Sequence, residues 1–285
     1  MMSLSSIYLD AFFVCAKWGH FTKAASEIHI TQSALSQRIA KLEEELGTTL
    51  FIRSKSGIEL TPAGQELLHY CLAKDSLESE CIDRIRGTNK DQLTGVIRIG
   101  GFSSVTRSVI LPALAELLNE NPQVKLNLYS NEMDQLPLML KRGEVDYMVL
   151  YNEWVRDELV TMHLADEINY LTEKKGYSGP NLFLDHHEKD QTTALYLKMK
   201  KSKGRMERRY LDDVYGLIDG VKLGIGRAVL PYHLIKDERS IKIVDKKTAL
   251  SFPVYLHYLH QPFYSDLHKA VVEALTLRCP KILKT

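Results

Sequence analysis

The N-terminal stretch carries apolar side chains at the spacing of short α-helices. Apolar residues recur every three or four positions from Leu9 to Ala16, and this stripe ends near Gly19. A second short helix is predicted from about Thr22 to Ile28. Residues three and four apart share one face of a helix, so both segments can bury a face in a common core. We therefore expect helices here rather than strands.

The next predicted helix has one apolar face and one small polar face. Thr31 suits the N-cap position, because its hydroxyl can accept a hydrogen bond from a free backbone N–H of the first turn. The apolar positions recur at i, i+4, i+7 and i+11, and they are Leu35, Ile39, Leu42 and Leu46. The opposite face carries Ser33, Ser36, Gln37 and Ala40. Such short, uncharged side chains let a helix enter the DNA major groove, where Ser and Gln can bond to base edges.

A hairpin and a long helix follow. Two short strands, Thr49–Arg53 and Ile58–Leu60, are predicted around a Ser-Lys-Ser-Gly turn. Thr61 then suits an N-cap before Pro62 at the first helical position, and the helix is expected to end at Gly87. Helix, helix–turn–helix and hairpin in this order predict a winged helix–turn–helix. A plain helical hairpin would share the spacing of the two helices.

After a hinge at Thr88–Thr94, strands alternate with helices. The predicted strands are Val96–Phe102, Val124–Ser130, Val145–Leu150, Ile225–Leu230 and Phe252–His260. The predicted helices are Val109–Leu118, Leu136–Leu140, Tyr210–Leu223, a segment opened by Pro231, and Phe263–Leu277. This alternation predicts βαβ units and a mainly parallel sheet. Residues 172–209 are strongly basic, and their pattern assigns no elements.

The stretch from Tyr8 to Gly64 carries a specific resemblance. Its pattern F-x-x-A-A-x-x-I-x-I-T-Q-S-A-L-S-x-x-I-x-x-L-E-x-x-L-G-x-x-L-F-x-R-(x)6-L-T-x-x-G is similar to the N-terminal domain of the LysR-type transcriptional regulators. The resemblance implies an α/β protein with an all-α winged helix–turn–helix domain at 1–61 and a linker helix with its hinge at 62–91. Residues 92–285 would form an effector-binding domain with the fold of periplasmic solute-binding proteins.

That effector-binding domain is expected to have two subdomains flanking a cleft. Subdomain I would cover about 92–162 and 259–285, and subdomain II about 163–258. The two crossings between subdomains are predicted near Val160–Asp166 and His257–Gln261. The linker helix would pair with its copy in a homodimer or homotetramer, which places two winged domains on an interrupted palindromic DNA site.

The resemblance and the residue types together indicate DNA contacts. The candidate DNA-binding residues are Lys23, Thr31, Gln32, Ser33, Ser36, Gln37, Arg38, Arg53 and Lys55. We expect the Ser and Gln side chains to read the major groove. Lys23, Arg38 and Lys55 would contact phosphates of double-stranded DNA, and Arg53 in the wing would reach the backbone or the minor groove.

A ligand site is predicted beyond the C-terminal ends of the strands, where open α/β sheets bind ligands. The candidate effector-binding residues are Phe102, Ser103, Ser104, Ser130, Asn131, Tyr151 and Asn152. Ser103 and Ser104 begin a helix, so their hydroxyls and free N–H groups would suit a carboxylate or phosphate. In the resembled family, effectors contact residues at these places, so a small anionic effector is expected. The alternative is that Ser103 and Ser130 only cap helices.

Composition changes this interpretation little. The net charge is +1, and charges in the N-terminal region are balanced, so a basic domain is not the argument for DNA binding. No signal-peptide pattern and no apolar run approaching ~18 residues is present, so a cytoplasmic location without membrane contact is expected. The four cysteines lack CxxC or metal-ligand spacing.

The sequence motifs support neither a catalytic site nor a metal site. Asp185–Glu188 contains two adjacent histidines, but adjacent residues rarely face one metal. No G-x-S-x-G nucleophile motif occurs. We expect no catalytic residue, no metal and no cofactor, and RNA polymerase is a candidate partner. Two alternatives stay open: a regulator without a small-molecule effector, controlled by a protein partner or its own assembly, and a small-molecule-binding protein that does not bind DNA.

Overall fold

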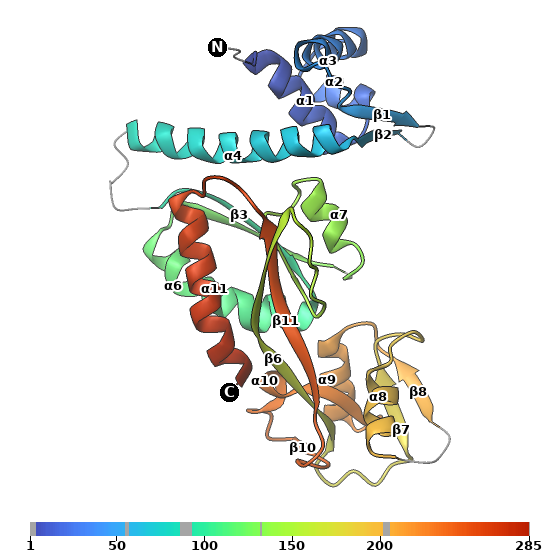
Figure 1. Ribbon diagram of the computed structural model, residues 1–285. Helices are drawn as coiled ribbons and strands as arrows, with labels where there is room; N and C mark the ends of the chain where they lie inside the picture. The colour runs from blue at the N-terminus through green and yellow to red at the C-terminus, as the bar shows by residue number, and fades with distance from the viewer. Residues whose placement is uncertain (1–3, 55–56, 86–92, 132, 202–205, 285) are drawn as a thin grey trace.

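The computed structural model describes residues 4–54, 57–85, 93–131, 133–201 and 206–284. A long helix lies between a small N-terminal unit and a larger α/β unit (Figure 1). The N-terminal elements are α1 (Ser6–Trp18), α2 (Phe21–Glu27), α3 (Gln32–Leu46), β1 (Phe51–Ser54), β2 (Gly57–Leu60) and the long helix α4 (Pro62–Ile85). These are the predicted elements with small shifts at their ends, although Gly87 and most of the predicted hinge lie outside the described residues.

The N-terminal unit closes around the apolar faces of its helices. Phe12, Leu35, Leu42 and Leu68 are almost completely buried in one core. The predicted caps are present: Ala34 N–H donates to Thr31 Oγ1 over 3.2 Å, and Gly64 N–H donates to Thr61 Oγ1 over 3.0 Å. The polar face of α3 is thereby turned outward, because its apolar face is held in the core.

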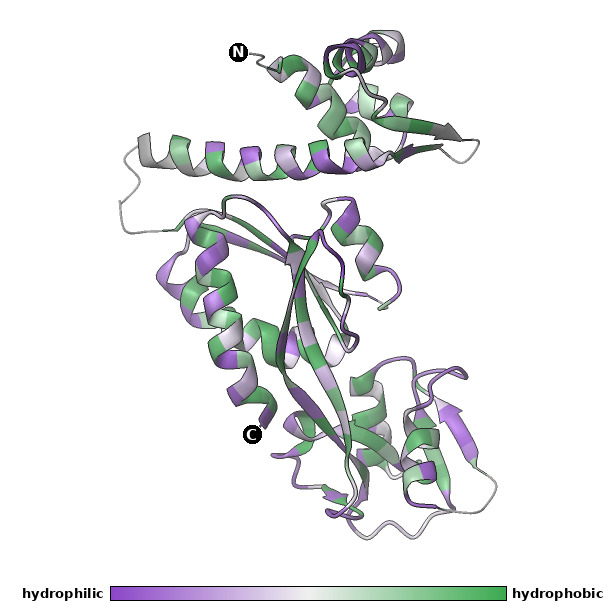
Figure 2. Ribbon diagram, viewed as in Figure 1, coloured by the Kyte–Doolittle hydropathy of each residue, from purple (hydrophilic) through white to green (hydrophobic). Residues whose placement is uncertain are grey.

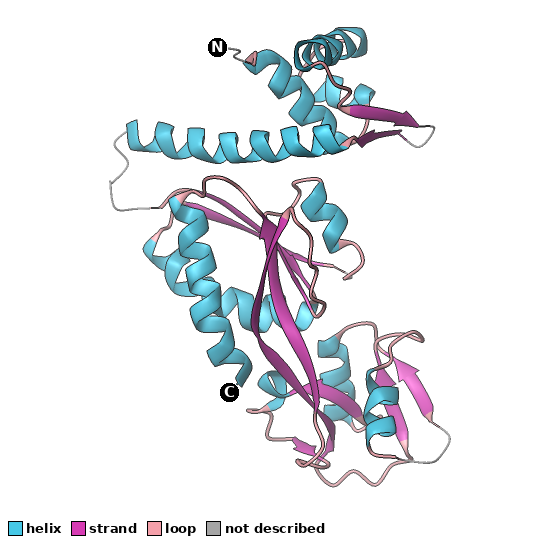
Figure 3. Ribbon diagram, in the orientation of Figure 1, coloured by secondary structure: helices cyan, strands magenta, loops and turns pink. Residues whose placement is uncertain are grey.

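The α/β unit contains the remaining elements (Figure 3). Its strands are β3 (Gly95–Gly101), β4 (Val124–Ser130), β5 (Tyr147–Leu150), β6 (Leu159–Lys174), β7 (Leu182–Asp185), β8 (Glu207–Tyr210), β9 (Ala228–Pro231), β10 (Ile241–Ile243) and β11 (Leu250–Leu259). Its helices are α5 (Ser103–Val105), the π-helical η1 (Thr106–Ile110), α6 (Leu111–Glu120), α7 (Leu136–Lys141), α8 (Thr192–Met199), α9 (Val214–Leu223), α10 (Tyr232–Ile235) and α11 (Asp266–Lys284).

The main sheet is mixed rather than mainly parallel, so that prediction was wrong in part. β4, β3 and β5 are parallel, as βαβ units require, but β11, β6 and β10 add antiparallel pairs. The long strands β6 and β11 pair from Leu159↔Leu259 to Leu250↔Asn169 and connect the two halves of the α/β unit. Alternation of strands and helices alone does not reveal such a crossing pair.

Strand β11 pairs with β6 along its whole length. Residues Tyr255–Tyr258 of β11 already pair with β5, which belongs to the first half of the unit. A bulge between Val254 and Tyr255 marks the change. The predicted crossing at His257–Gln261 overlaps the end of this stretch and stays a prediction.

The second half holds elements that the sequence pattern missed. β7, α8 and β8 lie within or at the end of the unassigned segment 172–209. The predicted helix from Tyr210 was wrong at its start, since Tyr210 ends β8 and α9 begins at Val214. Asp213 caps α9 by accepting from the N–H groups of Tyr215 and Gly216. Figure 2 shows β8 as strongly hydrophilic, which explains why no buried strand was predicted there.

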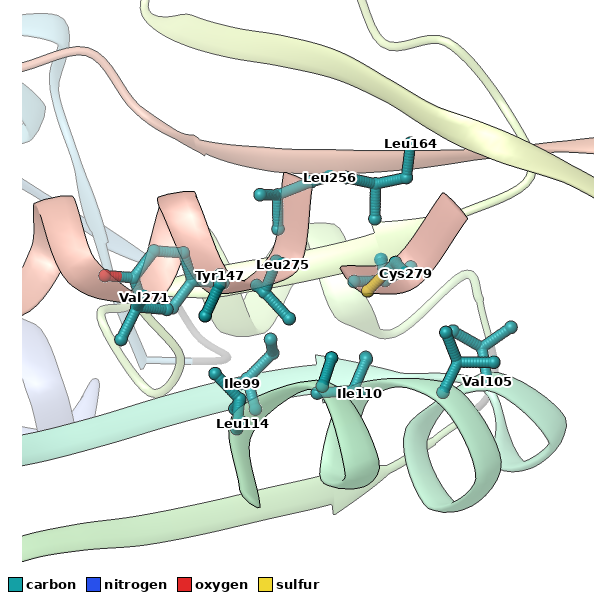
Figure 4. Packing of buried hydrophobic residues seen from close by; sticks show 14 of the residues in the cluster. Ile99, Val105, Ile110, Leu114, Tyr147, Leu164, Leu256, Val271, Leu275 and Cys279 are labelled. Atoms are coloured by element: carbon teal, nitrogen blue, oxygen red, sulfur yellow. The ribbon is translucent and has the colours of Figure 1, made fainter. Parts of the chain in front are cut away.

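A large apolar core holds the first half together (Figure 4). It joins β3 to the helices on one face of the sheet, with Ile99, Ile110, Leu114 and Leu275 at most 1% exposed. Cys279 on α11 is buried in the same core, where desolvation raises the pKa of its thiol to about 12. This rigid layer fixes the ends of β3, β4 and β5 relative to one another.

Candidate nucleic-acid interface and ligand cleft

The first turns of α3 present a continuous polar surface. Gln32, Ser33 and Gln37 are exposed, and Ser36 and Arg38 are half-buried beside them. The structure thus brings the predicted residues from Thr31 to Arg38 together, and Lys23 is exposed on α2. Arg53 lies on β1, and Lys55 lies outside the described residues.

Hydrogen bonds order part of this surface. Gln32 Nε2–H donates to Ser36 Oγ over 3.2 Å, and the hydroxyls of Thr31 and Ser33 are 3.0 Å apart. Bonds between exposed groups are worth little net energy because water replaces them, so these side chains can exchange partners. A helix with this face could donate and accept hydrogen bonds at base edges.

The wing is anchored to the same helix. Glu43 Oε1 accepts hydrogen bonds from the N–H groups of Leu50 and Phe51, over 2.7 and 3.3 Å. β1 and β2 then form a short antiparallel hairpin beyond this contact. Glu43 therefore fixes where the hairpin leaves α3, and the sequence analysis gave this residue no role.

The predicted ligand residues all line one cleft of about 920 Å³. They follow the ends of β3, β4 and β5, and they are Phe102, Ser103, Ser104, Ser130, Asn131, Tyr151 and Asn152. The three strands are parallel neighbours, so their C-terminal ends meet at one edge of the sheet. This arrangement explains why residues distant in the sequence come together.

The opposite wall comes from the second half and was missed by the sequence analysis. Its lining residues include His186, His187, Lys189, Asp190, Gln191, Thr192, Leu195, Asp212, Asp213 and Val214. Most belong to the segment that the pattern left unassigned. The adjacent histidines were the available signal, and they were considered only as metal ligands.

Aromatic rings form one side of the cleft. The ring centroids of Phe102 and Tyr151 are 4.1 Å apart, and those of Tyr151 and Phe252 are 5.3 Å apart. Phe252 comes from β11, one of the two crossing strands, so the stack joins both predicted and missed residues. Such a wall suits an apolar portion of a ligand.

Charged side chains face the cleft from the second half. His186 Nδ1 lies 2.9 Å from Asp190 Oδ2. Burial disfavours the Asp190 carboxylate, but hydrogen bonds from His186 and Thr192 outweigh it and lower the pKa of Asp190. Lys189, Asp212 and Asp213 are exposed at the cleft. This wall therefore carries both signs of charge rather than a purely basic surface.

A buried carboxyl group lies beneath the cleft. The hydroxyl of Tyr151 donates to Glu167 Oε2, and that of Ser104 donates to Glu167 Oε1 over 3.2 Å. Asn169 Nδ2 is 3.5 Å from Glu167 Oε2. Burial raises the pKa of Glu167 to about 7, although these three donors favour the charged form. The Ser104 hydroxyl is therefore engaged by Glu167, whereas no hydrogen bond among the described residues involves the Ser103 hydroxyl. The two serines thus differ from the equal roles expected.

The part of the chain that the structure describes carries neither a metal-binding cluster nor a helix that could span a membrane. No group of three or more His, Cys, Asp or Glu side chains there could hold a metal ion. In the same residues, no helix is both long enough and apolar enough to cross a membrane.

Comparisons with known proteins agree with this architecture. Residues 8–65 match the family described as "Bacterial regulatory helix-turn-helix protein, lysR family", and residues 90–168 match "LysR substrate binding domain". The carbapenem-hydrolyzing beta-lactamase transcriptional activator of Enterobacter cloacae is 27% identical over 257 residues, which are 87% of this chain and 83% of that protein. BudR of Klebsiella aerogenes, an HTH-type transcriptional regulator, is 35% identical over 140 residues, which are 49% of this chain and 97% of that protein.

A solved structure shares the whole fold. Full-length LysG from Corynebacterium glutamicum, solved with bound effector Arg, has a TM-score of 0.75 and 18% identity to this chain. The match covers 98% of this chain and 99% of that chain. At this identity the likeness shows a common fold.

Proposed function

Because this chain belongs to the LysR family of DNA-binding transcriptional regulators, we propose that α3 reads DNA sequence and that the cleft binds a controlling small molecule. The observation that carries the first half is the exposed Gln and Ser face of α3. Its apolar side is fixed in the core, its start is capped by Thr31, and its far end holds the wing through Glu43.

In this proposal each side chain has a separate task on DNA. Gln32, Ser33, Ser36 and Gln37 contact base edges in the major groove, and Gln37 is the exposed amide without a bond to a helix neighbour among the described contacts. Bidentate Gln–adenine contacts would give the sequence preference. Lys23, Arg38 and Lys55 contact phosphates, and Arg53 reaches the backbone or minor groove from the wing.

The proposed target is an interrupted palindrome. α4 exposes Tyr70, Leu77 and Ile82, whose apolar surface suits pairing with a second copy of the chain. A homodimer, or a tetramer of two such pairs, would place two winged domains on related half-sites. Regulators that act on bound promoters meet RNA polymerase, which we keep as a candidate partner, and DNA binding supports the cytoplasm as the place of action.

The proposed effector is small and carries an anionic group. Ser103 offers a hydroxyl at the end of β3, with Lys189 and His187 on the opposite wall. The aromatic stack would take an apolar part of the ligand. Because the cleft lies between the two halves of the α/β unit, a ligand that prefers one arrangement of the halves would shift the equilibrium between them. That shift would change how the winged domains sit on DNA.

Fluorescence anisotropy tests the DNA half of the proposal. The full-length protein is titrated against DNA from upstream of its own gene and against random DNA, at two salt concentrations. Preferential binding that survives the higher salt supports sequence reading by α3. Equal binding to both DNAs, with loss at the higher salt, would leave only phosphate attraction and contradict the proposal for that site. The same assay then screens small acids for a change in affinity.

A further inference from the structure

The buried contacts of Glu167 connect both halves of the α/β unit. Glu167 lies on the crossing strand β6, and its side chain is fully buried. Two of its donors, Ser104 and Tyr151, come from the first half and line the cleft. On its other side lies His233 of α10, whose side chain is 2% exposed and whose Nδ1 is 3.8 Å from Glu167 Oε1.

Hydrogen bonding fixes which nitrogen of His233 carries the hydrogen. The Ser108 hydroxyl has one hydrogen, and it donates this hydrogen to the backbone oxygen of Ser104. Ser108 Oγ is also 2.9 Å from His233 Nε2, an arrangement that favours the tautomer in which Nε2–H donates to Ser108. Burial lowers the pKa of His233 to about 4, so the ring is neutral near pH 7. Nδ1 therefore directs a lone pair toward Glu167, and it has no hydrogen-bond partner among the described residues.

An ionised Glu167 would place a negative oxygen opposite this lone pair, and both side chains are buried. A protonated Glu167 removes the repulsion, because its O–H can point at His233 Nδ1 while the carboxyl oxygens still accept from Ser104 and Tyr151. The other titratable groups near this cluster are His186, which favours the charged form of Glu167, and Asp190 beside Tyr151. Lys236 faces His233 and favours its neutral form.

We propose that Glu167 is a positioning residue of the effector cleft: a buried, protonated carboxyl group that draws the hydroxyl hydrogens of Ser104 and Tyr151 away from the ligand and faces the Nδ1 lone pair of His233. Both hydroxyl oxygens then face the cleft only as acceptors. A ligand group above them must donate a hydrogen bond, as a hydroxyl, amide or ammonium group does, and an anionic group belongs at Ser103 instead. The class of ligand inferred in this way rests on the proposed function of the cleft as the effector site.

The pH dependence of unfolding tests the proposal without ligand or DNA. The chain has two tryptophans, and in a Trp18→Phe background the fluorescence of Trp154 follows the α/β unit alone. A carboxyl pKa of 4.5 in the unfolded chain and about 7 in the folded protein means that the folded state holds the extra proton. Its stabilising effect is complete below pH 4.5 and is lost as the pH rises through 7. The unfolding constant should rise on the order of 100-fold between pH 5 and pH 8 from this group.

Glu167→Gln separates the proposal from an ordinary structural role. An amide oxygen in the place of Oε2 still accepts from Tyr151, and an amide N–H in the place of Oε1 can face His233 Nδ1. The amide nitrogen cannot accept from Ser104, so that one hydrogen bond is lost, but the side chain is uncharged at every pH. The unfolding constant of the variant should lack the rise expected for the parent between pH 5 and pH 8, so the stability of the variant relative to the parent should improve as the pH rises. A rise in the unfolding constant of the variant between pH 5 and pH 8 that equals the parent's would show that Glu167 takes up no proton on folding, and would overturn the proposal.

Glu173→Gln is the matched control on the same strand. Glu173 is 5% exposed and forms ion pairs with Arg227 and Lys242, in which the nitrogen–oxygen distances are 2.7 and 2.9 Å. Removing its charge should destabilise the protein at both pH 5 and pH 8, because both ion pairs of this buried carboxylate are lost. DNA and effector are absent from these measurements, so failure of this inference leaves the proposed function to its own anisotropy test.

Discussion

The face of α3 and the ligand cleft are built from the sequence in opposite ways. The α3 face consists of neighbours in the chain, from Thr31 to Arg38, on a single capped helix. The cleft gathers residues from Phe102 to Phe252 out of both halves of the α/β unit. A local motif defines its own surface, whereas a cleft depends on how distant elements pack. We therefore expect substitutions in α3 to affect the small N-terminal unit alone, and substitutions at the cleft to affect both of its walls.

The largest effect is expected from a substitution that removes a core residue beneath α3. Leu35 is fully buried, and Leu35→Ala should lower the free energy of unfolding of the N-terminal unit by about 2–5 kcal/mol, since it leaves a cavity. Trp18 lies in that unit and Trp154 in the other, so fluorescence of single-tryptophan variants separates the two transitions. We expect the Trp18 transition to move and the Trp154 transition to stay. Equal movement of both would show that the two regions unfold as one. Glu45→Ala, an exposed change on the same helix, is the control.

The same contrast explains what could be predicted from the sequence. The capped helix α3, the hairpin and the strand ends at Phe102, Ser130 and Tyr151 follow from local periodicity and from the rule for parallel strands. The opposite wall could not be predicted, because β8 is short and polar and Asp213 is a cap that becomes visible only once α9 is placed. Glu167 lies on β6, a strand that was not predicted, and its burial arises from contacts far away in the sequence.

The next effect concerns DNA sequence rather than folding. Gln37 is exposed, so Gln37→Ala should leave the unfolding transition of Trp18 in place. Affinity for the specific site should fall by about 1–3 kcal/mol, because one base contact is lost. Anisotropy on specific and random DNA measures this, and affinity for random DNA should not change. An unaltered sequence preference would remove Gln37 from the proposed base contacts.

Each of the two regions contains a capped helix, so the stability of the regions can be compared with two cap substitutions of similar free-energy cost. Thr31 caps α3 and Asp213 caps α9 at the cleft wall, each through its side-chain oxygen. Thr31→Ala and Asp213→Ala should each cost about 0.5–2 kcal/mol, while Thr31→Ser and Asp213→Asn should retain most of the stability. We expect Thr31→Ala to move only the Trp18 transition and Asp213→Ala only the Trp154 transition. A crossed response would contradict the separation of the two regions.

The smallest effect distinguishes two adjacent serines within the cleft. Ser104 is held by Glu167, and Ser103 has the hydroxyl proposed to meet the anionic group of a ligand. Ser103→Ala should weaken the response to acids that alter DNA affinity by about 0.5–1.5 kcal/mol, the value of one hydrogen bond. Dimerisation, followed by size-exclusion chromatography with light scattering, should not change. Ser104→Ala should instead alter the pH dependence of Trp154 unfolding, because it removes a donor to Glu167. If the two substitutions had the same effects on acid response and on pH dependence, the proposal that Ser103 binds the ligand and Ser104 binds Glu167 would be wrong.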